Sequence, residues 1–430
     1  MVYKLLLLFC LYLPFQLATN PASGIDLASG RIIILIFFVL WLLVSLKDKK
    51  LIISSNFQTI LIISFLFLSS FSFIFVQNSE WYLRKLLFLF SIFPLYFIVP
   101  AIANNFAKIK KIIEFLVWGA GGAAILGIIQ FSLQFILGLK ETTRIWANFI
   151  TPFLGSSFSE AVMKNPSWLV GISGHDFFRA ISVFPDPHMF SFYLNLILPW
   201  SLILYFSSGK KKLFLILFFL ILSADLLTFS RGGYLGLISS AIITILFFRK
   251  KIAEFWKIPK YKYKKLTLVI SAVFVITTLS VPNPISQRFF SSFKADEGSN
   301  QGRIENWTNS LSVITHNPLG VGLGNYSLEI KLSADYREPI YSHNLYFDIA
   351  AETGIINALV WIILIFSSIF SYLKKAKDNY FYLGGALGLI SFFVHSFFET
   401  ALFSTQVLPL LLIIIAVSTL SLNESDEKNY

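Results

Sequence analysis

The sequence predicts an all-α polytopic membrane protein with about 12 transmembrane helices and two long periplasmic or extracytoplasmic loops that contain short helices. The chain has 430 residues, of which 56% are hydrophobic and 17% aromatic, and its mean hydropathy is +0.72. This composition excludes a soluble globular domain. Continuous apolar runs long enough to cross a hydrocarbon core of about 30 Å recur along most of the chain. An outer-membrane barrel would instead need alternating segments of about ten residues.

Twelve apolar runs predict the transmembrane helices. The first run begins soon after Lys4 and could be a signal peptide, but no clear small-x-small cleavage site follows it in LATNPASG. We therefore favour an uncleaved first helix. The predicted helices cover residues 4–18, 31–46, 57–76, 83–103, 112–137, 190–207, 212–229, 232–248, 266–281, 344–372, 380–398 and 403–422.

Basic clusters in alternate loops predict the orientation of these helices. Lysine and arginine concentrate in cytoplasmic loops, where anionic lipids of the inner leaflet attract them. The net charge of +12 is therefore explained by membrane lipid and requires no nucleic-acid partner. The clusters are KDKK at 47–50, KIKK at 108–111, KKK at 210–212, the basic stretch at 249–265 and KKAK at 374–377.

Two long segments between the helices face the opposite side, away from the cytoplasm. Both carry Gly, Pro, Asn, Trp and isolated charges rather than apolar runs, so we expect short helices and turns that form a cap over the outer ends of the bundle. The single cysteine, Cys10, lies in the first apolar run, so neither loop can form an internal disulfide. The predicted parts are N-terminal helices at 1–137, a first long loop at 138–189, central helices at 190–281, a large loop at 282–343 and C-terminal helices at 344–430.

The sequence lacks the motifs of soluble nucleotide-binding enzymes, hydrolases and metalloenzymes. It has no GxxxxGK phosphate loop, no HExxH, no GxSxG and no cysteine pair. The five histidines are not spaced as a zinc site, and DPH at 186–188 is too short a match to indicate one. We therefore expect neither a metal nor a cofactor.

Three arginines outside the basic loops predict an anion-binding site. Arg231 follows TFS at a helix end, and the next two residues, Gly232 and Gly233, would let the backbone turn sharply and approach a ligand. Arg303 opens RIENWTNSLSVI, whose spacing predicts a short amphipathic helix with this arginine in its first turn. Arg179 could join them. Guanidinium groups suit pyrophosphate oxygens, although each arginine alone could equally bond lipid phosphate or a nearby carboxylate.

His343 is the candidate general base. It lies at the start of the predicted helix 344–372, where we expect the membrane interface. A neutral imidazole with an unperturbed pKa near 6.5 could accept a proton from a sugar hydroxyl, which is the task of a base in glycosyl transfer. The structural alternative is a histidine that caps the helix.

Four further ionisable residues form two pairs at helical spacing. Asp348 and Glu352 share a helix face that, at 100° per residue, lies well away from His343, so pairing with loop arginines is an alternative for them. His395 and Glu399 lie near an outer helix end, where charge within the membrane is usually functional or paired. We treat all four as candidates for contacts that hold the substrate-binding and catalytic residues in place.

Four segments together resemble the O-antigen ligase and O-antigen polymerase superfamily of membrane glycosyltransferases. Their order, the loop lengths and the helix count also agree with that family. The specific resemblance runs from Phe178 to Leu359, and the remainder agrees only in hydropathy. The segments are FRAISVFPDPHMFSFYL, LLTFSRGGYLGLI, GRIENWTNSLSVITHNPLGVGLGNY and YSHNLYFDIAAETGIINAL.

The ligase branch of that superfamily has a pattern of His, then Asn, Ser or Gln, then nine residues and Gly. His343, Asn344 and Gly354 match this pattern. Asn357 departs from the small or aromatic residue often found three positions after the glycine. The departure affects the assignment to the ligase branch more than the assignment to the superfamily.

The resemblance implies roles for individual residues. Arg231 and Arg303 would bind the diphosphate of an undecaprenyl-diphosphate-linked glycan, and His343 would activate the acceptor hydroxyl. The remaining substrate-binding candidates are Arg179, His188 and Asn344.

The implied reaction is a metal-independent, inverting transfer on the periplasmic side of the cytoplasmic (inner) membrane. The acceptor could be lipid A core, a second lipid-linked glycan in a polymerase, or a protein in an oligosaccharyltransferase, and the sequence leaves these open. A glycolipid transporter or flippase is the alternative from another class, but it predicts symmetry between the halves of the chain, which the sequence does not show. A sensor or structural anchor would need a cytoplasmic domain to act on, and none is evident.

Overall fold

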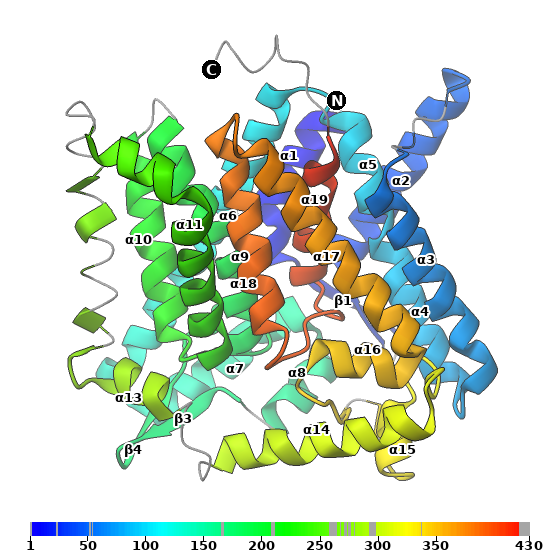
Figure 1. The fold of residues 1–430 in the computed structure, drawn as a ribbon. Coiled ribbons are helices and arrows are strands. Elements are labelled where there is room, and N and C mark those ends of the chain that lie inside the picture. Colours follow the sequence, from blue (N-terminus) through cyan, green and yellow to red (C-terminus); the bar gives the residue numbers. More distant parts are fainter. Residues whose placement is uncertain are drawn as a thin grey trace.

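The computed structural model is mostly helical and has almost no sheet (Figure 1). Six of its described helical segments are long and apolar enough to cross a membrane, and four shorter apolar helices accompany them. The multi-pass membrane class is therefore confirmed, whereas the count of twelve spans stays a prediction. The structure describes residues 2–420 except 23–24, 51–52, 54, 165–166, 208–210, 258–264, 267, 271–272, 274–276, 279, 292–297 and 337.

The described residues of the N-terminal third form six α-helices and one short hairpin. Strands β1 and β2 pair antiparallel between the first two helices, although an all-α class predicts no strands. The elements are α1 (Val2–Tyr12), β1 (Ala18–Ala22), β2 (Ile25–Ala28), α2 (Ser29–Lys47), α3 (Phe57–Phe71), α4 (Ser79–Ile92), α5 (Pro94–Ile102) and α6 (Phe106–Leu137). The predicted span 83–103 is divided between α4 and α5, because Pro94 begins a new helix.

The middle of the chain supplies three further long helices and part of a layer at one end of the bundle. A second antiparallel hairpin, β3–β4, lies in this layer. The elements are α7 (Leu139–Leu154), α8 (Ser156–Lys164), β3 (Leu169–Ile172), β4 (His175–Phe178), α9 (Pro187–Ser207), α10 (Lys211–Leu227) and α11 (Arg231–Lys257). Much of the predicted span 266–281 and of the basic stretch 249–265 lies outside the described residues.

The C-terminal part contributes the rest of that layer and the centre of the bundle. The elements are α13 (Pro284–Phe290), α14 (Gly298–His316), α15 (Tyr326–Ile330), α16 (Leu345–Thr353), α17 (Ile355–Lys375), α18 (Leu383–His395) and α19 (Val407–Thr419). The predicted helix 344–372 is two helices, because Gly354 between α16 and α17 has a φ of 92° that interrupts regular helix. The last two residues of the predicted span 403–422 lie outside the described residues.

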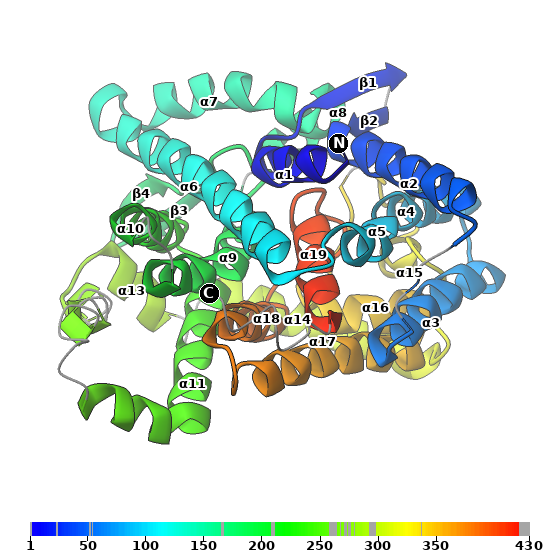
Figure 2. The ribbon, with the colours of Figure 1, turned by 90° about the horizontal axis from the view of Figure 1, so that it is seen from above.

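Apolar surface on every side of α19 places it in the core. Its residues from Val407 to Ser418 are all buried. Figure 2 shows α19 enclosed by the other helices, and it packs against α5, α9, α17 and α18. A helix that is hydrophobic all round is stable only when it is buried in this way.

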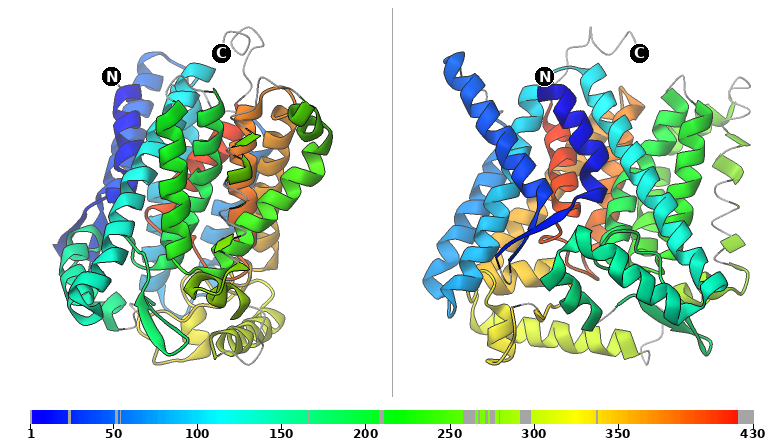
Figure 3. Two further views of the ribbon diagram at one scale, coloured as in Figure 1. Left: turned by 90° about the vertical axis from the view of Figure 1, so that its left-hand side faces the viewer. Right: turned by 180° about the vertical axis from the view of Figure 1, so that it is seen from behind.

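The described helices of the two predicted long segments lie together at one end of the bundle. Helices α7, α8, α13, α14 and α15 occupy the lower end in Figure 1, together with α16 and the β3–β4 hairpin. Two further views show the same layer at this end (Figure 3). The helix ends that carry the basic clusters at Lys47, Lys108 and Lys375 lie at the other end. We call this lower layer the cap; its location outside the cytoplasm stays a prediction.

Candidate functional site

The centre of the candidate site is an ion pair between His343 and Glu399. The histidine Nδ1 lies 3.0 Å from Oε1 and 3.1 Å from Oε2 of the carboxylate. His343 precedes α16, and Glu399 lies in the loop after α18. The Asn344 side chain caps α16 by accepting hydrogen bonds from the N–H groups of Tyr346 and Phe347. The cap of this helix is therefore Asn344 and not His343, and the Asn344 oxygen is engaged within the fold.

The charge of Glu399 changes the protonation of His343. Its attraction outweighs the effect of burial and raises the pKa of His343 to about 9. Burial alone would raise the pKa of Glu399, but the charge of His343 and its hydrogen bond hold that pKa well below its usual range. The pKa of His343 therefore lies above its ordinary value because Glu399 favours the imidazolium form, and the role of His343 as the base stays a prediction.

His343 also has an uncommon backbone conformation. Its φ of 53° lies in the left-handed region, which costs on the order of 1–3 kcal/mol for a residue with a side chain. Neighbouring contacts hold it there, since Ser342 Oγ donates to the Asn344 carbonyl and Leu345 N–H donates to the Ser396 carbonyl. Backbone strain of this kind is concentrated at functional sites, where the surrounding structure maintains it.

Arg179 ties three segments together beside this pair. Its Nε donates to the Thr228 carbonyl at 2.7 Å, and its Nη1 donates to the Ser167 carbonyl at 3.0 Å. Burial, followed by the charge of Arg288, lowers the pKa of Arg179 to about 9. Two of the Arg179 donors are therefore used within the fold, although the sequence predicted that this guanidinium binds substrate. Its role in binding stays a prediction.

Two glutamines of α6 hold the segment that carries Arg179. Gln130 Oε1 accepts from Ile181 N–H, and its Nε2 donates to the Arg179 carbonyl. Gln134 makes a matching pair of bonds to the backbone of Phe178. Gln130 and Gln134 were not among the predicted site residues, although two amides within an apolar span are a detectable signal of interhelical hydrogen bonding.

Two histidines meet across a serine hydroxyl. Ser230 Oγ lies 3.0 Å from His188 Nδ1 and 3.1 Å from His395 Nε2. His188 Nε2 in turn lies 3.5 Å from Arg179 Nη2. His395 is fully buried and stacks on Phe192 at a ring separation of 3.7 Å. The structure therefore brings His188 and His395 together through Ser230, a residue that sequence reasoning missed although it directly precedes Arg231.

Arg231 is the first residue of α11, whereas the sequence analysis expected a turn at the two glycines before the next helix begins. Gly232 and Gly233 lie within the helix, and the left-handed turn occurs at Phe229, whose φ is 51°. A Cβ atom on Gly232 would lie 2.5 Å from the ring of His395. The predicted sharp turn at the glycines is therefore wrong. Gly232 instead lets α11 pack closely against α18, and the Arg231 guanidinium donates through Nη1 to Ser291 Oγ at 3.4 Å.

Arg303 lies on the helix that covers the site. The helix α14 begins at Gly298, so Arg303 is in its second turn and not, as predicted, in its first. Four residues further along, Trp307 contacts Phe347 of α16 and Phe398 beside Glu399, which turns this face of α14 toward the ion pair. The charge of Arg303 acts on His343, Glu399 and Arg179.

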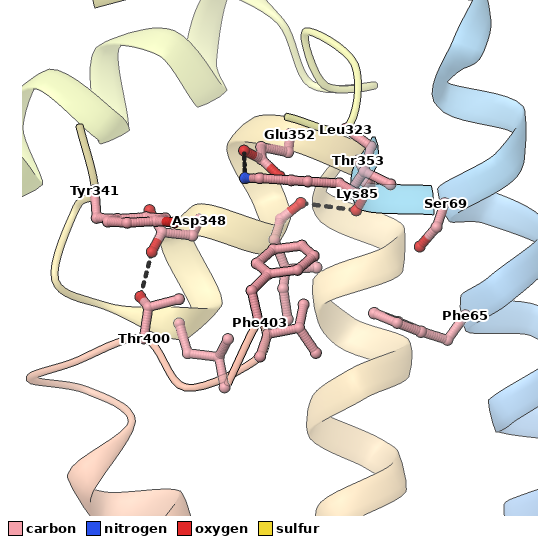
Figure 4. A pocket seen from close by; sticks show the side chains of 13 residues that line it. Phe65, Ser69, Lys85, Leu323, Tyr341, Asp348, Glu352, Thr353, Thr400 and Phe403 are labelled. Carbon is pink, nitrogen blue, oxygen red and sulfur yellow. Dashed lines mark hydrogen bonds and ion pairs between the residues drawn. The ribbon is translucent and has the colours of Figure 1, made fainter. Parts of the chain in front are cut away.

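Asp348 and Glu352 have partners other than the loop arginines that were considered for them. Glu352 Oε1 pairs with Lys85 Nζ of α4 at 2.7 Å, and both side chains are buried (Figure 4). Asp348 accepts hydrogen bonds from Ser342 N–H and from the Thr400 hydroxyl. Asp348 thus contacts the neighbours of His343 and Glu399 even though its helix face points away from the histidine.

The structure gathers most of the predicted site residues into one cluster at the boundary of bundle and cap. Among the described residues, no group of three or more His, Cys, Asp or Glu side chains is arranged to hold a metal ion. Glu352 lies apart, paired with Lys85. The residues that come together are His343, Glu399, Arg303, Arg179, His188 and His395, with Arg231 and Asp348 at the edge.

Comparison with known proteins confirms the resemblance to the O-antigen ligase and polymerase superfamily. Residues 215–362 match a family model described as O-Antigen ligase. The chain is 30% identical over 196 residues to an O-antigen polymerase of Salmonella muenchen, covering 45% of this chain and 47% of that protein. It is 25% identical over 289 residues to a ComP-specific O-oligosaccharyltransferase of Acinetobacter baylyi, covering 63% of this chain and 46% of that protein. The aligned regions thus span about half the length of these curated relatives.

Proposed function

We propose that this relative of the O-antigen ligases and polymerases transfers a glycan from an undecaprenyl-diphosphate carrier to an acceptor hydroxyl on the outer face of the cytoplasmic membrane. The observation that carries the proposal is the His343–Glu399 pair, which lies under Arg303 at the end of the bundle. A base and a cation beside each other match the two needs of this reaction, which are to accept a proton and to stabilise a departing diphosphate.

The acceptor is activated by His343 in its neutral form. Nδ1 faces Glu399, so the other ring nitrogen, Nε2, is the atom that takes the proton of the acceptor hydroxyl. Glu399 then stabilises the imidazolium that forms, as a carboxylate does for the histidine of a catalytic triad. The freed acceptor oxygen attacks the anomeric carbon from the side opposite the leaving group, which inverts its configuration.

The leaving group is stabilised by arginine. As the new C–O bond forms, the bond between the anomeric carbon and the diphosphate oxygen breaks, and the diphosphate keeps the electron pair. Arg303 and Arg231 supply planar donors for its oxygens, and their charge persists at any physiological pH. We propose that these groups suffice without a metal ion.

The acceptor distinguishes a ligase from a polymerase. The ligase assignment is supported by the match of residues 215–362 and by the His343, Asn344 and Gly354 pattern. The polymerase alternative is supported by the relative from Salmonella muenchen, whose name is O-antigen polymerase. The two predict different products, which are a single glycan on a foreign acceptor and a lengthening chain on the lipid carrier.

The experiment is glycan transfer in proteoliposomes from an undecaprenyl-diphosphate donor, with EDTA present and the acceptor varied. The wild type is expected to form a new glycosidic bond, while folded His343→Ala should lose most of that activity. Product length on lipid A core, on a second lipid-linked glycan and on a protein acceptor identifies the branch. Movement of glycolipid across the bilayer without a new bond would instead assign the chain to the transporters.

A further inference from the structure

A small pocket with both polar and apolar lining lies next to the residues that flank the ion pair, since Thr400 directly follows Glu399 (Figure 4). Side chains of α4, α16 and the loop after α18 line it, among them Lys85, Asp348, Glu352 and Thr400. Its free volume of about 10 Å³ is barely enough for one water molecule and far too small for a sugar. The polar groups here therefore hold parts of the protein to one another.

One carboxylate in this pocket bonds to both segments that form the ion pair. Asp348 Oδ1 accepts the N–H of Ser342 at 2.9 Å, and Ser342 directly precedes His343. Asp348 Oδ2 accepts the hydroxyl of Thr400, which directly follows Glu399. Only 7% of Asp348 is exposed, so water does not compete effectively for these bonds.

Other contacts join the two segments on one side of the ion pair only, between residues that follow His343 and residues that precede Glu399. Leu345 N–H donates to the Ser396 carbonyl at 2.9 Å, and the rings of Tyr346 and Phe397 lie 4.8 Å apart. Thr400 N–H also donates to Glu399 Oε1 at 3.2 Å, so a shift of Thr400 would move the carboxylate. The left-handed conformation of His343 likewise persists only if neighbouring contacts maintain it.

We infer that Asp348 is a positioning residue, whose carboxylate clamps the Ser342 and Thr400 segments together and thereby keeps His343 within hydrogen-bond distance of Glu399. The effect on catalysis rests on the proposed function, whereas the effect on the ion pair can be measured without turnover. Holding catalytic groups in place matters because a misplacement of about 1 Å can cost about a hundredfold in rate.

The charged groups around His343 and Asp348 determine the midpoint that a titration of His343 would give. His343 is influenced by Glu399, Arg303 and Asp348. Asp348 is buried next to Glu352, which Lys85 neutralises, and near Tyr326. Burial, partly offset by the bonds from Thr400 and Ser342, raises the pKa of Asp348 to about 6, so the clamp is ionised where His343 titrates.

The test is the titration of His343 in detergent-solubilised protein with ¹³C-labelled histidine, assigned among the five histidines with His343→Ala. The wild-type midpoint is expected near 9. Asp348→Ala should lower it by at least about one unit toward the unperturbed 6.5, because Glu399 would no longer be held against the ring. Asp348→Asn should lower the midpoint less than Asp348→Ala does, since an amide can accept from Ser342 and donate to Thr400 and only the charge of Asp348, which itself raises the pKa of His343, is lost.

Two further variants isolate the clamp from general damage to the pocket. Tyr341→Phe alters a side chain that lines the same pocket and should leave the midpoint unchanged. Thr400→Val removes one arm of the clamp and should lower the midpoint, whereas Thr400→Ser should not. If Asp348→Ala does not fold, the Thr400 pair decides the result.

Measuring glycan transfer together with the His343 midpoint distinguishes a failure of this inference from a failure of the proposed function. With an active wild type, Asp348→Ala should lower kcat by about tenfold or more while the donor KM changes little. The inferred role of Asp348 would be refuted if folded Asp348→Ala had an unchanged His343 midpoint. If that variant does not fold, an unchanged midpoint in Thr400→Val would refute it. A shifted midpoint in a protein whose wild type transfers no glycan would retain the clamp and refute the proposed function.

Discussion

At the residue scale, Glu399 makes His343 a stronger base and at the same time a scarcer one. A pKa of about 9 leaves roughly one molecule in a hundred neutral at pH 7. The neutral form accepts a proton more readily than an unpaired histidine would, and its product, the imidazolium, is stabilised by the adjacent carboxylate. The reaction should therefore be faster at alkaline pH, which a histidine of ordinary pKa would not produce.

Removing the Arg303 charge should impair transfer without unfolding the protein. Arg303→Ala should lower kcat by on the order of a hundredfold, because a preorganised donor for the leaving diphosphate is lost. The kcat of Arg303→Lys should lie between those of wild type and Arg303→Ala, since lysine keeps the charge but not the planar arrangement of donors. The measurement is kcat in the proteoliposome transfer assay.

A matched control exists in the same cap. Arg144 is exposed and pairs with Glu141 on α7, far from the ion pair in the chain and without a part in the proposed chemistry. Arg144→Ala should leave kcat within about twofold of wild type, as expected for an exposed ion pair. Equal losses in Arg144→Ala and Arg303→Ala would mean that the cap responds to net charge and not to a specific donor.

Sequence reasoning could name individual site residues but not their partners. His343, Arg231 and Arg303 stand out because each is isolated outside the basic loops. Helical periodicity reports neighbours within one helix, whereas His343 and Glu399 are 56 residues apart and Lys85 and Glu352 are 267 residues apart. Those pairings depend on how helices pack, so the raised pKa of His343 could not be anticipated either.

At the element scale, Gly354 separates α16 in the cap from α17 in the bundle. Hydropathy continues across this position, and for that reason the sequence predicted one helix. The glycine has a φ of 92°, and a Cβ atom there would lie 2.9 Å from the backbone of Leu319. The break turns α16 along the end of the bundle, which places Asn344 and His343 at the site.

Gly354→Ala should therefore destabilise the cap. Both the backbone conformation and the contact with Leu319 oppose a side chain, and together they should cost at least about 2 kcal/mol. Gly302→Ala in α14 is the control, because no atom lies within 4 Å of its added methyl group and alanine favours helix. Thermal unfolding in detergent measures both. Equal melting temperatures for the two variants would contradict the assigned role of Gly354.

At the scale of the whole molecule, the described basic clusters at Lys47, Lys108 and Lys375 and the helices of the cap lie at opposite ends. This separation follows from the sequence, because charge and apolar length determine which segments can cross a bilayer. The arrangement of the short helices and the hairpin in the cap cannot be predicted from charge and apolar length, because it depends on how these elements pack against one another. Gln134 and Gln130 of α6, for example, bind the backbone of Phe178, the last residue of β4, and of Arg179, which are more than forty residues away in the chain.

Cysteine labelling tests the orientation directly. Cys10 is fully buried and can be replaced to give a background without accessible thiols. Leu332→Cys, at an 86% exposed position of the cap, should react with a membrane-impermeant maleimide added to intact cells. Asp378→Cys, exposed beyond α17 at the other end, should react only after the membrane is opened. The reverse labelling pattern would place the candidate site in the cytoplasm.

The most direct test of the central claim is the pH dependence of kcat for glycan transfer by wild type and Glu399→Gln. If neutral His343 is the base, the wild-type rate should rise about tenfold per pH unit from pH 7 and level off near pH 9. In Glu399→Gln the rise should level off near pH 6.5, at a plateau lower by about a hundredfold or more. Superimposable profiles, or a wild-type rate that is flat between pH 7 and 9, would contradict catalysis by the His343–Glu399 pair.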